Sequence, residues 1–320
     1  MILKILLIII ILSTSLLLTP GESFSYWVWT PQTKKWINPK YAPKDTPKEQ
    51  LMYALDLFEA KDIRKALEEF KKVVSYFRKS EAAAEAQYYI GRCYEELNNP
   101  YQAFEAYQNV IDNYPFSQRT DEIIKREYDI GEKLFEGEKV KFVGVSFKAT
   151  PEQIVEIYKK IVSNGPYSEY APKAQYRVGE LYKRLHFYPE ALAAFQKIVA
   201  DYPDSDIAAQ AEFQVAICAS AGSSGAAYDQ QLTTKAIEKF DEFASAHPDS
   251  ELVKEAQKER SELTEKKAES LFETAKFYEK RKKYKSAIIY YEEIIDNFPT
   301  TKTAPLAMER LEVLKRKVKD

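Results

Sequence analysis

The stretch GRCYEELNNPYQAFEAYQNVIDNYP, residues 91–115, decides the fold of this chain because its pattern returns several times. Gly91 is followed by Ala103 after twelve residues, and Ala103 is followed by Pro115 after twelve more. Copies of one pattern at a fixed spacing are the sequence signature of a repeat protein, in which each copy forms the same small unit. The same small–small–proline spacing recurs in residues 179–203 and 275–299, and it begins again at Ala54 and Ala66, where Arg78 replaces the proline.

Two further copies carry insertions: Gly131 pairs with Ile154 and Pro166, and Ala216 pairs with Ala236 and Pro248. Residues 136–150 lengthen the turn inside the first of these copies by eleven residues. Their apolar, β-type sequence predicts a loop that either packs against the helices or touches a partner. Residues 219–233 lengthen the second copy by eight residues, and their Gly/Ser-rich sequence predicts a mobile surface loop.

Each uninterrupted copy predicts two antiparallel helices, because its apolar and small residues recur at intervals of three and four. In the quoted stretch, Gly91 and Ala103 let the two helix backbones approach each other, and Tyr107 is expected to fill the space between neighbouring helices. Pro115 ends the second helix because its ring cannot continue the hydrogen-bond ladder. The serines that follow the prolines are candidate N-caps of the next helix, namely Ser117, Ser168, Ser205 and Ser250.

This pattern resembles the tetratricopeptide repeat, which has small residues and proline at these offsets. Six copies over about residues 50–300 predict an all-α fold, a right-handed tetratricopeptide-repeat solenoid of about six helix pairs. We assign residues 49–301 to the solenoid and residues 302–320 to a C-terminal capping helix. Such solenoids hold partner segments in a concave groove, built mainly from the first helix of each pair, and Tyr88 and Arg92 are our candidate groove residues.

The N-terminal segment has the layout of a secretory signal peptide, which we assign to residues 1–25. Lys4 gives a positive start, residues 5–18 are almost entirely apolar, and Ser23 and Ser25 suit cleavage after Ser25. A retained signal anchor is the alternative, although the apolar run is short for a membrane span. Both readings place the rest of the chain outside the cytoplasm. No cysteine lies near residue 20, so the sequence does not support a lipid anchor.

All three tryptophans of the chain, Trp27, Trp29 and Trp36, lie in an N-terminal extension that we assign to residues 26–48. Trp27 and Trp29 alternate across Val28, and residues 30–33 favour a turn, so Trp36 is expected to return against them in a small hairpin. This much apolar surface predicts one of two roles. The hairpin either seals the end of the first repeat, or docks a partner, a client chain or the membrane interface.

Composition and motifs exclude several function classes. The chain is 30% charged with a net charge of −2, which argues against nucleic acid as the main partner. Its sequence has no metal-ligand spacing, phosphate-binding loop or nucleophile motif, so we expect no enzyme, no cofactor and no metal site. Cys93 and Cys218 occupy similar positions in separate repeats and are expected to be small buried residues rather than a disulfide.

The last copies differ from the others in their connections. Residues 250–280 contain no proline or glycine and predict one long helix that joins the last two units. The basic turn KRKKYK, residues 280–285, contains Arg281, Lys282 and Lys283. Such a turn is either simply solvated, or it faces anionic lipid or an acidic partner.

The segment HPDSELVKEAQKERSELTEKKAESLFETAKFYEKRKKYKSAIIYYEEIIDNFPTT resembles the outer-membrane β-barrel assembly lipoproteins of the BamD type, with the similarity covering about residues 205–314. The resemblance rests on the long helix, the AKFYEKR motif that follows it and the closing F-P-T-T. It implies a periplasmic scaffold at the outer membrane whose partners are a barrel insertase and unfolded outer-membrane protein segments. The chain departs from that family in lacking the lipidated cysteine, in having about one extra repeat, and in carrying Tyr290 where the family often has arginine.

The alternative function is that of another periplasmic repeat adaptor, one that couples the Tol-Pal system or the cell-wall synthesis machinery. The repeats of such adaptors end in a similar Y-P-x-S motif, which favours this alternative. These adaptors usually carry an N-terminal coiled coil, however, and residues 26–49 show no heptads. A lytic transglycosylase with a helical superstructure is a third class. It is disfavoured because the repeats fill the chain and leave no room for a catalytic domain.

Overall fold

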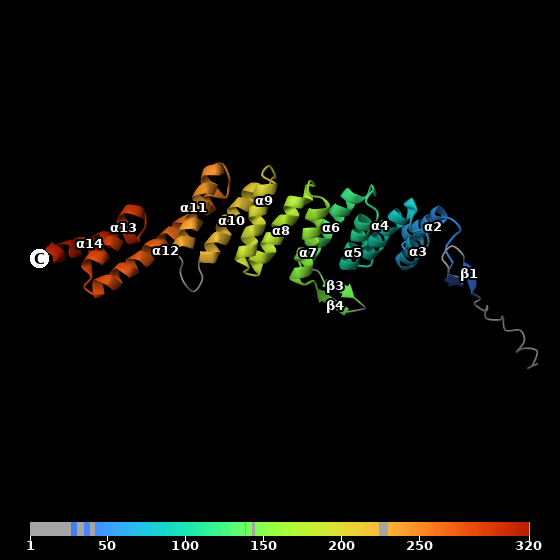
Figure 1. Ribbon diagram of the computed structural model, residues 1–320, viewed down its shortest axis with the longest axis horizontal. Coiled ribbons are helices and arrows are strands. Elements are labelled where there is room, and N and C mark those ends of the chain that lie inside the picture. The colour runs from blue at the N-terminus through green and yellow to red at the C-terminus, as the bar shows by residue number, and fades with distance from the viewer. Residues whose placement is uncertain are drawn as a thin grey trace, which may run out of the picture. The chain divides into compact units, whose positions relative to one another are not determined.

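The computed structural model describes residues 27–30, 35–38, 42–137, 139–142, 145–223 and 230–319. The signal peptide assigned to residues 1–25 lies outside these residues. Contacts along the chain divide it into two compact units, Met1–Gln118 and Arg119–Asp320. Figure 1 shows that both units are built from helices that follow one another in antiparallel order.

The first unit contains a two-stranded sheet and two helix pairs. Its elements are β1 (Val28–Thr30), β2 (Lys35–Ile37), α2 (Pro47–Glu59), α3 (Ile63–Tyr76), α4 (Glu81–Glu96) and α5 (Pro100–Asn113). Each helix packs on the next, and the first helices of the two pairs, α2 and α4, also pack on each other. Stacking of like helices across successive pairs is the arrangement of a tetratricopeptide-type solenoid.

The second unit contains four helix pairs, a hairpin and a last single helix. Its elements are α6 (Thr120–Phe135), β3 (Lys139–Phe142), β4 (Val145–Lys148), α7 (Pro151–Asn164), α8 (Tyr170–Arg184), α9 (Tyr188–Asp201), α10 (Ala208–Ser223), α11 (Gln230–Ala246), α12 (Val253–Lys280), α13 (Tyr284–Asn297) and α14 (Thr303–Lys319). Together with the two pairs of the first unit, these helix pairs confirm the predicted all-α fold built from tetratricopeptide-type pairs.

The pairs α4–α5, α6–α7 and α8–α9 are each closed by a large ring of the second helix that lies on a glycine of the first. A Cβ atom added at Gly91 would come within 2.3 Å of the ring of Tyr107, and one at Gly179 within 2.7 Å of the ring of Phe195. Distances under 3 Å are too short for real Cβ contacts. Glycine is therefore required there for close packing, although a helix interior otherwise disfavours it.

Tyrosine rings at this repeat position are also held by a hydrogen bond at their hydroxyl end. The Tyr107 hydroxyl donates to Glu95 at 2.7 Å, and the Tyr291 hydroxyl donates to Glu279 at 3.1 Å. In both repeats the glutamate lies four residues after the small residue, Gly91 or Ala275, and so faces the same side of the first helix. Burial is the main cause that raises the pKa of Tyr291 to about 12, so this hydroxyl keeps its proton and remains a donor.

The turn between the two helices of a pair uses a left-handed residue at one fixed repeat position. Lys61, Asn98, His186 and Lys282 all have φ values near +60°. Each follows the small residue of its first helix by seven positions, and its N–H bonds back to a carbonyl of the last helical turn. A left-handed residue at this point ends a helix while satisfying its carbonyls. His186 therefore has a turn role, as its sequence position indicates.

The two insertions differ in how well the sequence predicts them. Residues 136–150 include the antiparallel hairpin of β3 and β4, in keeping with their β-type composition. The prediction of a loop over residues 219–233 is wrong at both ends, because α10 continues to Ser223 and α11 begins at Gln230, and residues 224–229 lie outside the described residues. Alanines favour helix continuation more strongly than the accompanying serines oppose it.

Ser168 is not the N-cap that we predict, whereas the Ser250 hydroxyl accepts the N–H of Leu252 at 3.3 Å just before α12. The hydroxyl of Ser168 donates to the carbonyl oxygen of Gly165 at 2.7 Å, and α8 begins after Glu169 without a side-chain cap. The same backward bond is made by Ser80 to Phe77. These hydroxyls therefore stabilise the turn between repeats rather than the start of the next helix.

The predicted long helix is confirmed as α12, which also caps the helix that ends the chain. The Glu265 carboxylate accepts the backbone N–H groups of Lys302 and Thr303 at 2.8 and 3.1 Å and the Thr303 hydroxyl at 2.7 Å. These donors lie at the start of α14, where N–H groups lack helical partners. Burial would raise the pKa of Glu265, but these hydrogen bonds outweigh it and lower the pKa.

We expect Gly91→Ala to lower the free energy of unfolding by about 1–3 kcal/mol, because the new methyl group meets the buried Tyr107 ring. Urea denaturation followed by far-UV circular dichroism measures this change. The double variant Gly91→Ala/Tyr107→Leu should lose less than the sum of its single variants. A Gly91→Ala protein that is more stable than the original, as at an open helix position, would contradict the close packing.

We expect Glu265→Gln to destabilise the docking of α14 by about 1 kcal/mol, since a neutral acceptor caps a helix less strongly. The exposed neighbour Glu269 provides the control substitution Glu269→Gln, which should have little effect. The pKa of Glu265 is lowered in the folded chain, so its stabilising effect is present above the ordinary carboxyl pKa of 4.5 and is lost as pH falls through the folded value. The protection of α14 amides against hydrogen exchange should therefore fall in acid more in the original protein than in the variant.

Candidate functional site

The groove residues predicted in the first unit lie together, but only one of them is accessible. Arg92 Nη1 lies 3.3 Å from the Tyr88 hydroxyl, and its guanidinium also lies 5.8 Å from the centre of the Phe58 ring. Tyr88 is only 1% exposed and packs against the ring of Tyr107 at 5.8 Å. Tyr88 is thus a core residue, which corrects its prediction as a direct contact, and Arg92 is the member of the pair that can face a partner.

The second unit places a network of charged side chains on the first helices of two successive pairs. Arg177 of α8 donates from Nε to Glu132 of α6 at 2.9 Å and from Nη1 to Glu180 at 2.6 Å. The Tyr158 hydroxyl of α7 donates to the same Glu132 at 2.6 Å. One carboxylate therefore joins three helices, which sets how α6 and α8 pack beside each other.

An aromatic ring lies between two arginines at the edge of this network. The guanidinium carbons of Arg177 and Arg184 lie 4.9 and 3.9 Å from the centre of the Phe135 ring. Burial is the largest influence on Arg177 and would lower its pKa, but the hydrogen bonds that Arg177 donates to Glu132 and Glu180 outweigh it and raise the pKa. Arg177 therefore stays charged. Burial followed by the bond to Glu132 raises the pKa of Tyr158, so that hydroxyl stays a donor.

Sequence reasoning missed this network, although a signal for it exists. Glu132 directly follows the small residue Gly131, and Arg177 precedes Gly179 by two positions. First-helix positions next to the small residue lie on the side that lines the groove of such repeats. A comparison of these positions in neighbouring repeats would have predicted that Glu132 and Arg177 lie side by side.

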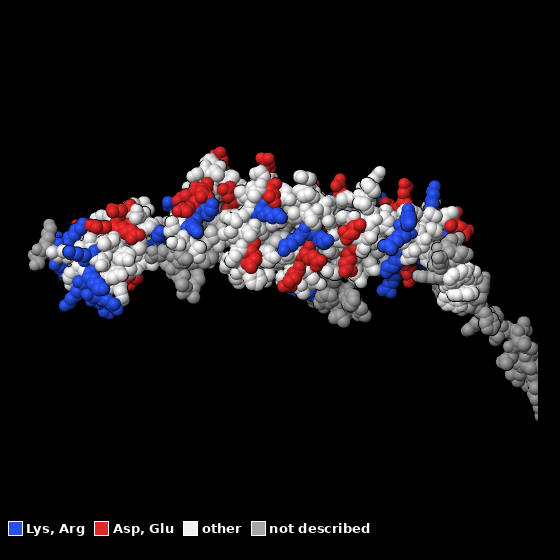
Figure 2. Space-filling view, viewed as in Figure 1, with Lys and Arg blue, Asp and Glu red and all other residues white. Residues whose placement is uncertain are grey.

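The predicted residues of the C-terminal edge lie on the turn between α12 and α13, with one exception. Arg281 is exposed and its guanidinium carbon lies 4.3 Å from the centre of the Phe277 ring, which is 50% exposed. Lys282 and Lys283 are exposed in the turn itself, and Figure 2 shows Lys and Arg gathered at this end of the second unit. Tyr290 instead stacks on Tyr278 at 5.5 Å and is half-buried.

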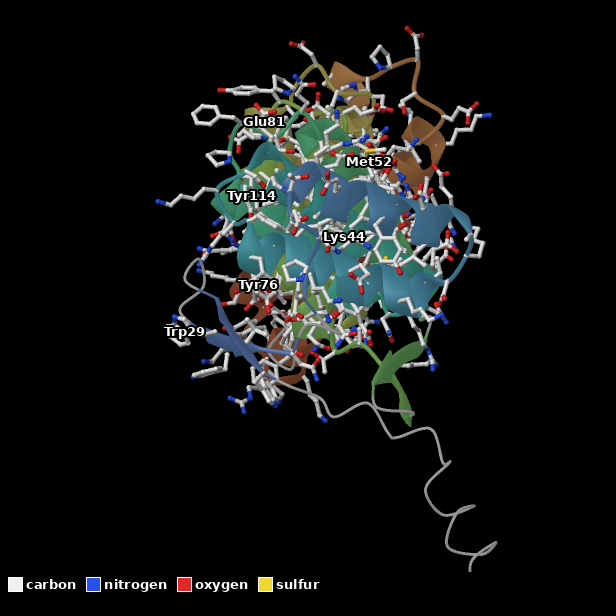
Figure 3. The ribbon with its side chains drawn as sticks, turned by 90° about the vertical axis from the view of Figure 1, so that its right-hand side faces the viewer. Trp29, Lys44, Met52, Tyr76, Glu81 and Tyr114 are labelled. Atoms are coloured by element: carbon white, nitrogen blue, oxygen red, sulfur yellow. The ribbon has the colours of Figure 1, made fainter. Side chains whose placement is uncertain are left out.

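The tryptophans form the hairpin that their spacing predicts. In the register of β1 and β2, Trp29 lies opposite Trp36, and their rings meet edge to face with centres 5.8 Å apart. Trp27, Trp29 and Trp36 are 62%, 45% and 63% exposed. Figure 3 shows Trp29 on the hairpin, to one side of the helices of the first unit. The rings are thus not buried as a seal of the first repeat would require.

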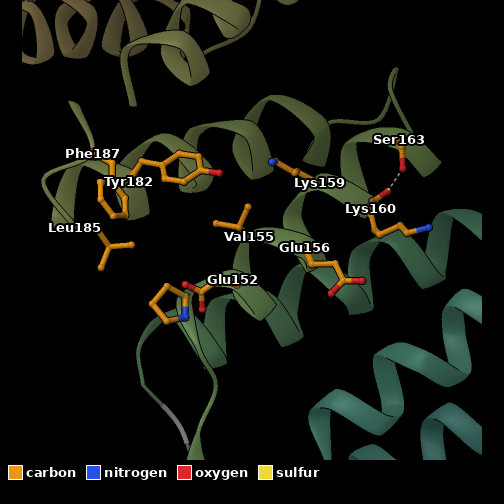
Figure 4. Close-up of a pocket in the computed structure, with 10 residues that line it drawn as sticks. Glu152, Val155, Glu156, Lys159, Lys160, Ser163, Tyr182, Leu185 and Phe187 are labelled. Carbon is orange, nitrogen blue, oxygen red and sulfur yellow. Dashed lines mark hydrogen bonds between the residues drawn. The ribbon is translucent and has the colours of Figure 1, made fainter. Parts of the chain in front are cut away.

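A surface cavity lies between α7 and the C-terminal end of α8 (Figure 4). Its volume is about 610 Å³. Val155 of α7, Tyr182 of α8, and Leu185 and Phe187 of the α8–α9 connection supply apolar walls, and Lys159 also lines the cavity. This size and lining suit an apolar side chain of a partner.

Both cysteines are free and buried, as we predict. Burial raises the pKa of the Cys93 thiol to about 12 and that of Cys218 to about 11. Neither thiol is therefore an activated nucleophile. Among the described residues, no group of His, Cys, Asp and Glu side chains has the arrangement of a metal site, and no helix is long and apolar enough to cross a membrane.

Two family models match parts of the chain. Residues 215–319, which run from the middle of α10 to the end of α14, match the YfiO model, described as an outer membrane lipoprotein. Residues 85–117 and 173–205, which hold the pairs α4–α5 and α8–α9, match a tetratricopeptide-repeat model. No curated protein matches the chain. The matches and the helix pairs indicate a scaffold for protein–protein interaction with a YfiO-like C-terminal part.

Solved structures of other repeat proteins are similar at low identity. The C-terminal part of a repeat protein from Cytophaga hutchinsonii is 17% identical, with a TM-score of 0.36, and the match covers 82% of this chain and 88% of that one. YrrB, described as having an unusual peptide-binding site, is 16% identical with a TM-score of 0.35, covering 69% and 94%. PilW, a type IV pilus biogenesis factor, is 14% identical with a TM-score of 0.29, covering 83% and 99%. None of these likenesses assigns a function.

We expect Arg177→Lys to lower the free energy of unfolding by roughly 1–2 kcal/mol, because an ammonium group cannot keep both planar contacts with Glu132 and Glu180. Urea denaturation measures the loss. The exposed Arg316 provides the matched control Arg316→Lys, which should leave the midpoint unchanged. Equal midpoints for both variants would show that the network does not hold α6 and α8 together.

Proposed function

We propose that this chain is a periplasmic scaffold, associated with the outer membrane, that binds a barrel insertase and unfolded outer-membrane protein segments. The match of residues 215–319 to an outer membrane lipoprotein model is the observation that carries the proposal. The repeats supply the binding surfaces, because a stack of helix pairs exposes one face of every pair to partners.

The C-terminal repeats are the proposed insertase-binding surface. Four large apolar side chains there are half exposed or more, namely Phe277, Ile289, Leu306 and Met308. Exposed apolar residues beside charged ones are typical of docking surfaces. The basic turn next to Phe277 favours a soluble partner domain with an acidic rim.

The cavity of the second unit is the proposed contact for client segments. Strands of outer-membrane barrels alternate apolar and polar residues and carry many aromatic side chains. One such side chain would fill the space between Val155 and Phe187, while the rim charges of Glu156 and Lys159 bond to the polar backbone of the segment. The segment remains extended in this arrangement, which suits a protein that has not yet folded.

A photo-crosslinking amino acid tests the insertase surface in living cells with an outer membrane. We expect substitution at Phe277 or Ile289 to give a crosslink to a barrel protein that has soluble periplasmic domains. Phe116 and Tyr167 are 97% and 100% exposed and provide matched positions outside the matched region. They should give no such product.

Two results would contradict this proposal. Crosslinks from Phe277 and Ile289 to Tol-Pal or cell-wall synthesis components, without a barrel protein, would favour the alternative adaptor function. Equal capture of the barrel protein at Phe116 and Tyr167 would show that the C-terminal repeats are not the specific surface.

A further inference from the structure

We propose that the tryptophan hairpin binds the surface of an anionic lipid bilayer. This inference goes beyond the scaffold function and does not depend on the identity of the protein partner. It follows from three observations: the three rings share one face of the hairpin, that face is exposed, and the surrounding sequence is strongly basic.

All three rings lie on one face because of the strand geometry. Trp27 and Trp29 are two residues apart, and side chains at this interval in an extended strand point to the same side. Trp29 and Trp36 are directly opposite in the register, and such cross-strand neighbours also share a face. Val28, opposite Ile37, takes the other face. The hairpin therefore has a face made of indole rings.

This indole face is not part of the core of the first unit. The buried cluster of that unit consists of residues from α2 to α5, centred on Phe70 and Val73. Trp27 and Trp36 keep more than 60% of their surface exposed, and Trp29 keeps 45%. An isolated two-stranded hairpin is only marginally stable in water. Rings that contribute so little to the core but share one face of the hairpin suit an external apolar surface.

The charge of the extension identifies the surface as anionic. Residues 26–48 contain five lysines and a single acidic residue, Asp45, whereas the whole chain has a net charge of −2. Lys44 and Lys48 are exposed, and the Lys44 ammonium lies 4.7 Å from the centre of the Tyr53 ring. Tryptophan prefers the boundary between lipid headgroups and hydrocarbon. Lysines beside it add attraction to anionic headgroups.

A lipid surface fits this combination better than a protein partner. A protein-binding aromatic patch usually fills pockets and has few lysines at its centre. Three indoles in one face, on an extension whose sequence carries five lysines, match the interface of a bilayer in both polarity and charge. The hairpin would thus hold the first unit at a membrane surface, with the indoles at headgroup depth and no span across the bilayer.

Tryptophan fluorescence tests the proposal without any substitution, because the chain has no tryptophan outside this hairpin. The protein is purified in the form in which a bacterial envelope processes it and is titrated with phosphatidylglycerol/phosphatidylcholine vesicles. We expect the emission to shift to shorter wavelength, and lipids brominated near the headgroup to quench it more than lipids brominated at the chain end. Emission that stays unshifted and open to iodide would overturn the proposal and leave a protein partner as the occupant.

Charge variants then test the role of the lysines. Lys44→Gln and Lys48→Gln should each raise the vesicle concentration at half-maximal shift by about fivefold, and added salt should weaken binding further. Lys197→Gln and Lys235→Gln, exposed lysines of the second unit, are the matched controls and should have no effect. An equal loss of vesicle affinity in the test variants and in the control variants would show nonspecific attraction and contradict a site at the hairpin.

A sealing role for the hairpin gives a different result. Replacement of Trp27, Trp29 and Trp36 by alanine should leave the urea midpoint of the helices unchanged if the indole face is external. A lower midpoint would show that the hairpin stabilises the first repeat, and this outcome would overturn the proposal.

Discussion

The contact between a ring of one helix and a glycine of the preceding helix determines how the pairs α4–α5, α6–α7 and α8–α9 are built. These contacts are Tyr107 on Gly91, Tyr158 on Gly131 and Phe195 on Gly179. The ring can approach the helix backbone only because no Cβ lies in its way, and this closeness sets the angle at which the two helices meet. Neighbouring pairs then stack through the remaining apolar faces, so stability is a sum of local contacts.

This constraint explains why so much of the fold can be predicted from the sequence. The twelve-residue interval between small residues equals the length of one helix and its turn, and it is kept in the pairs that carry no insertion between their helices. The same interval also locates the left-handed turn residue, since Asn98 and His186 hold one position in their repeats. The tryptophan hairpin is predictable for a similar reason, because alternation and turn residues are local signals.

Other features depend on contacts that no local pattern contains. Glu132 and Arg177 are 45 positions apart and meet only because α6 and α8 stack. Tyr88 has the polar end expected of a groove residue, but neighbouring rings bury it. The Gly/Ser-rich composition of residues 219–233 suggests a loop, yet helix propensity of alanine and packing of α10 extend the helix to Ser223. Tertiary packing decided each of these three cases.

The most direct test of the scaffold account is amide hydrogen exchange of the protein with and without the purified soluble domains of a barrel insertase. The account predicts slower exchange at the α12–α13 turn and in α14, with no change in α2 to α5. Protection confined to α2 to α5, or no protection anywhere under conditions where the two proteins are shown to bind, would contradict a C-terminal docking surface.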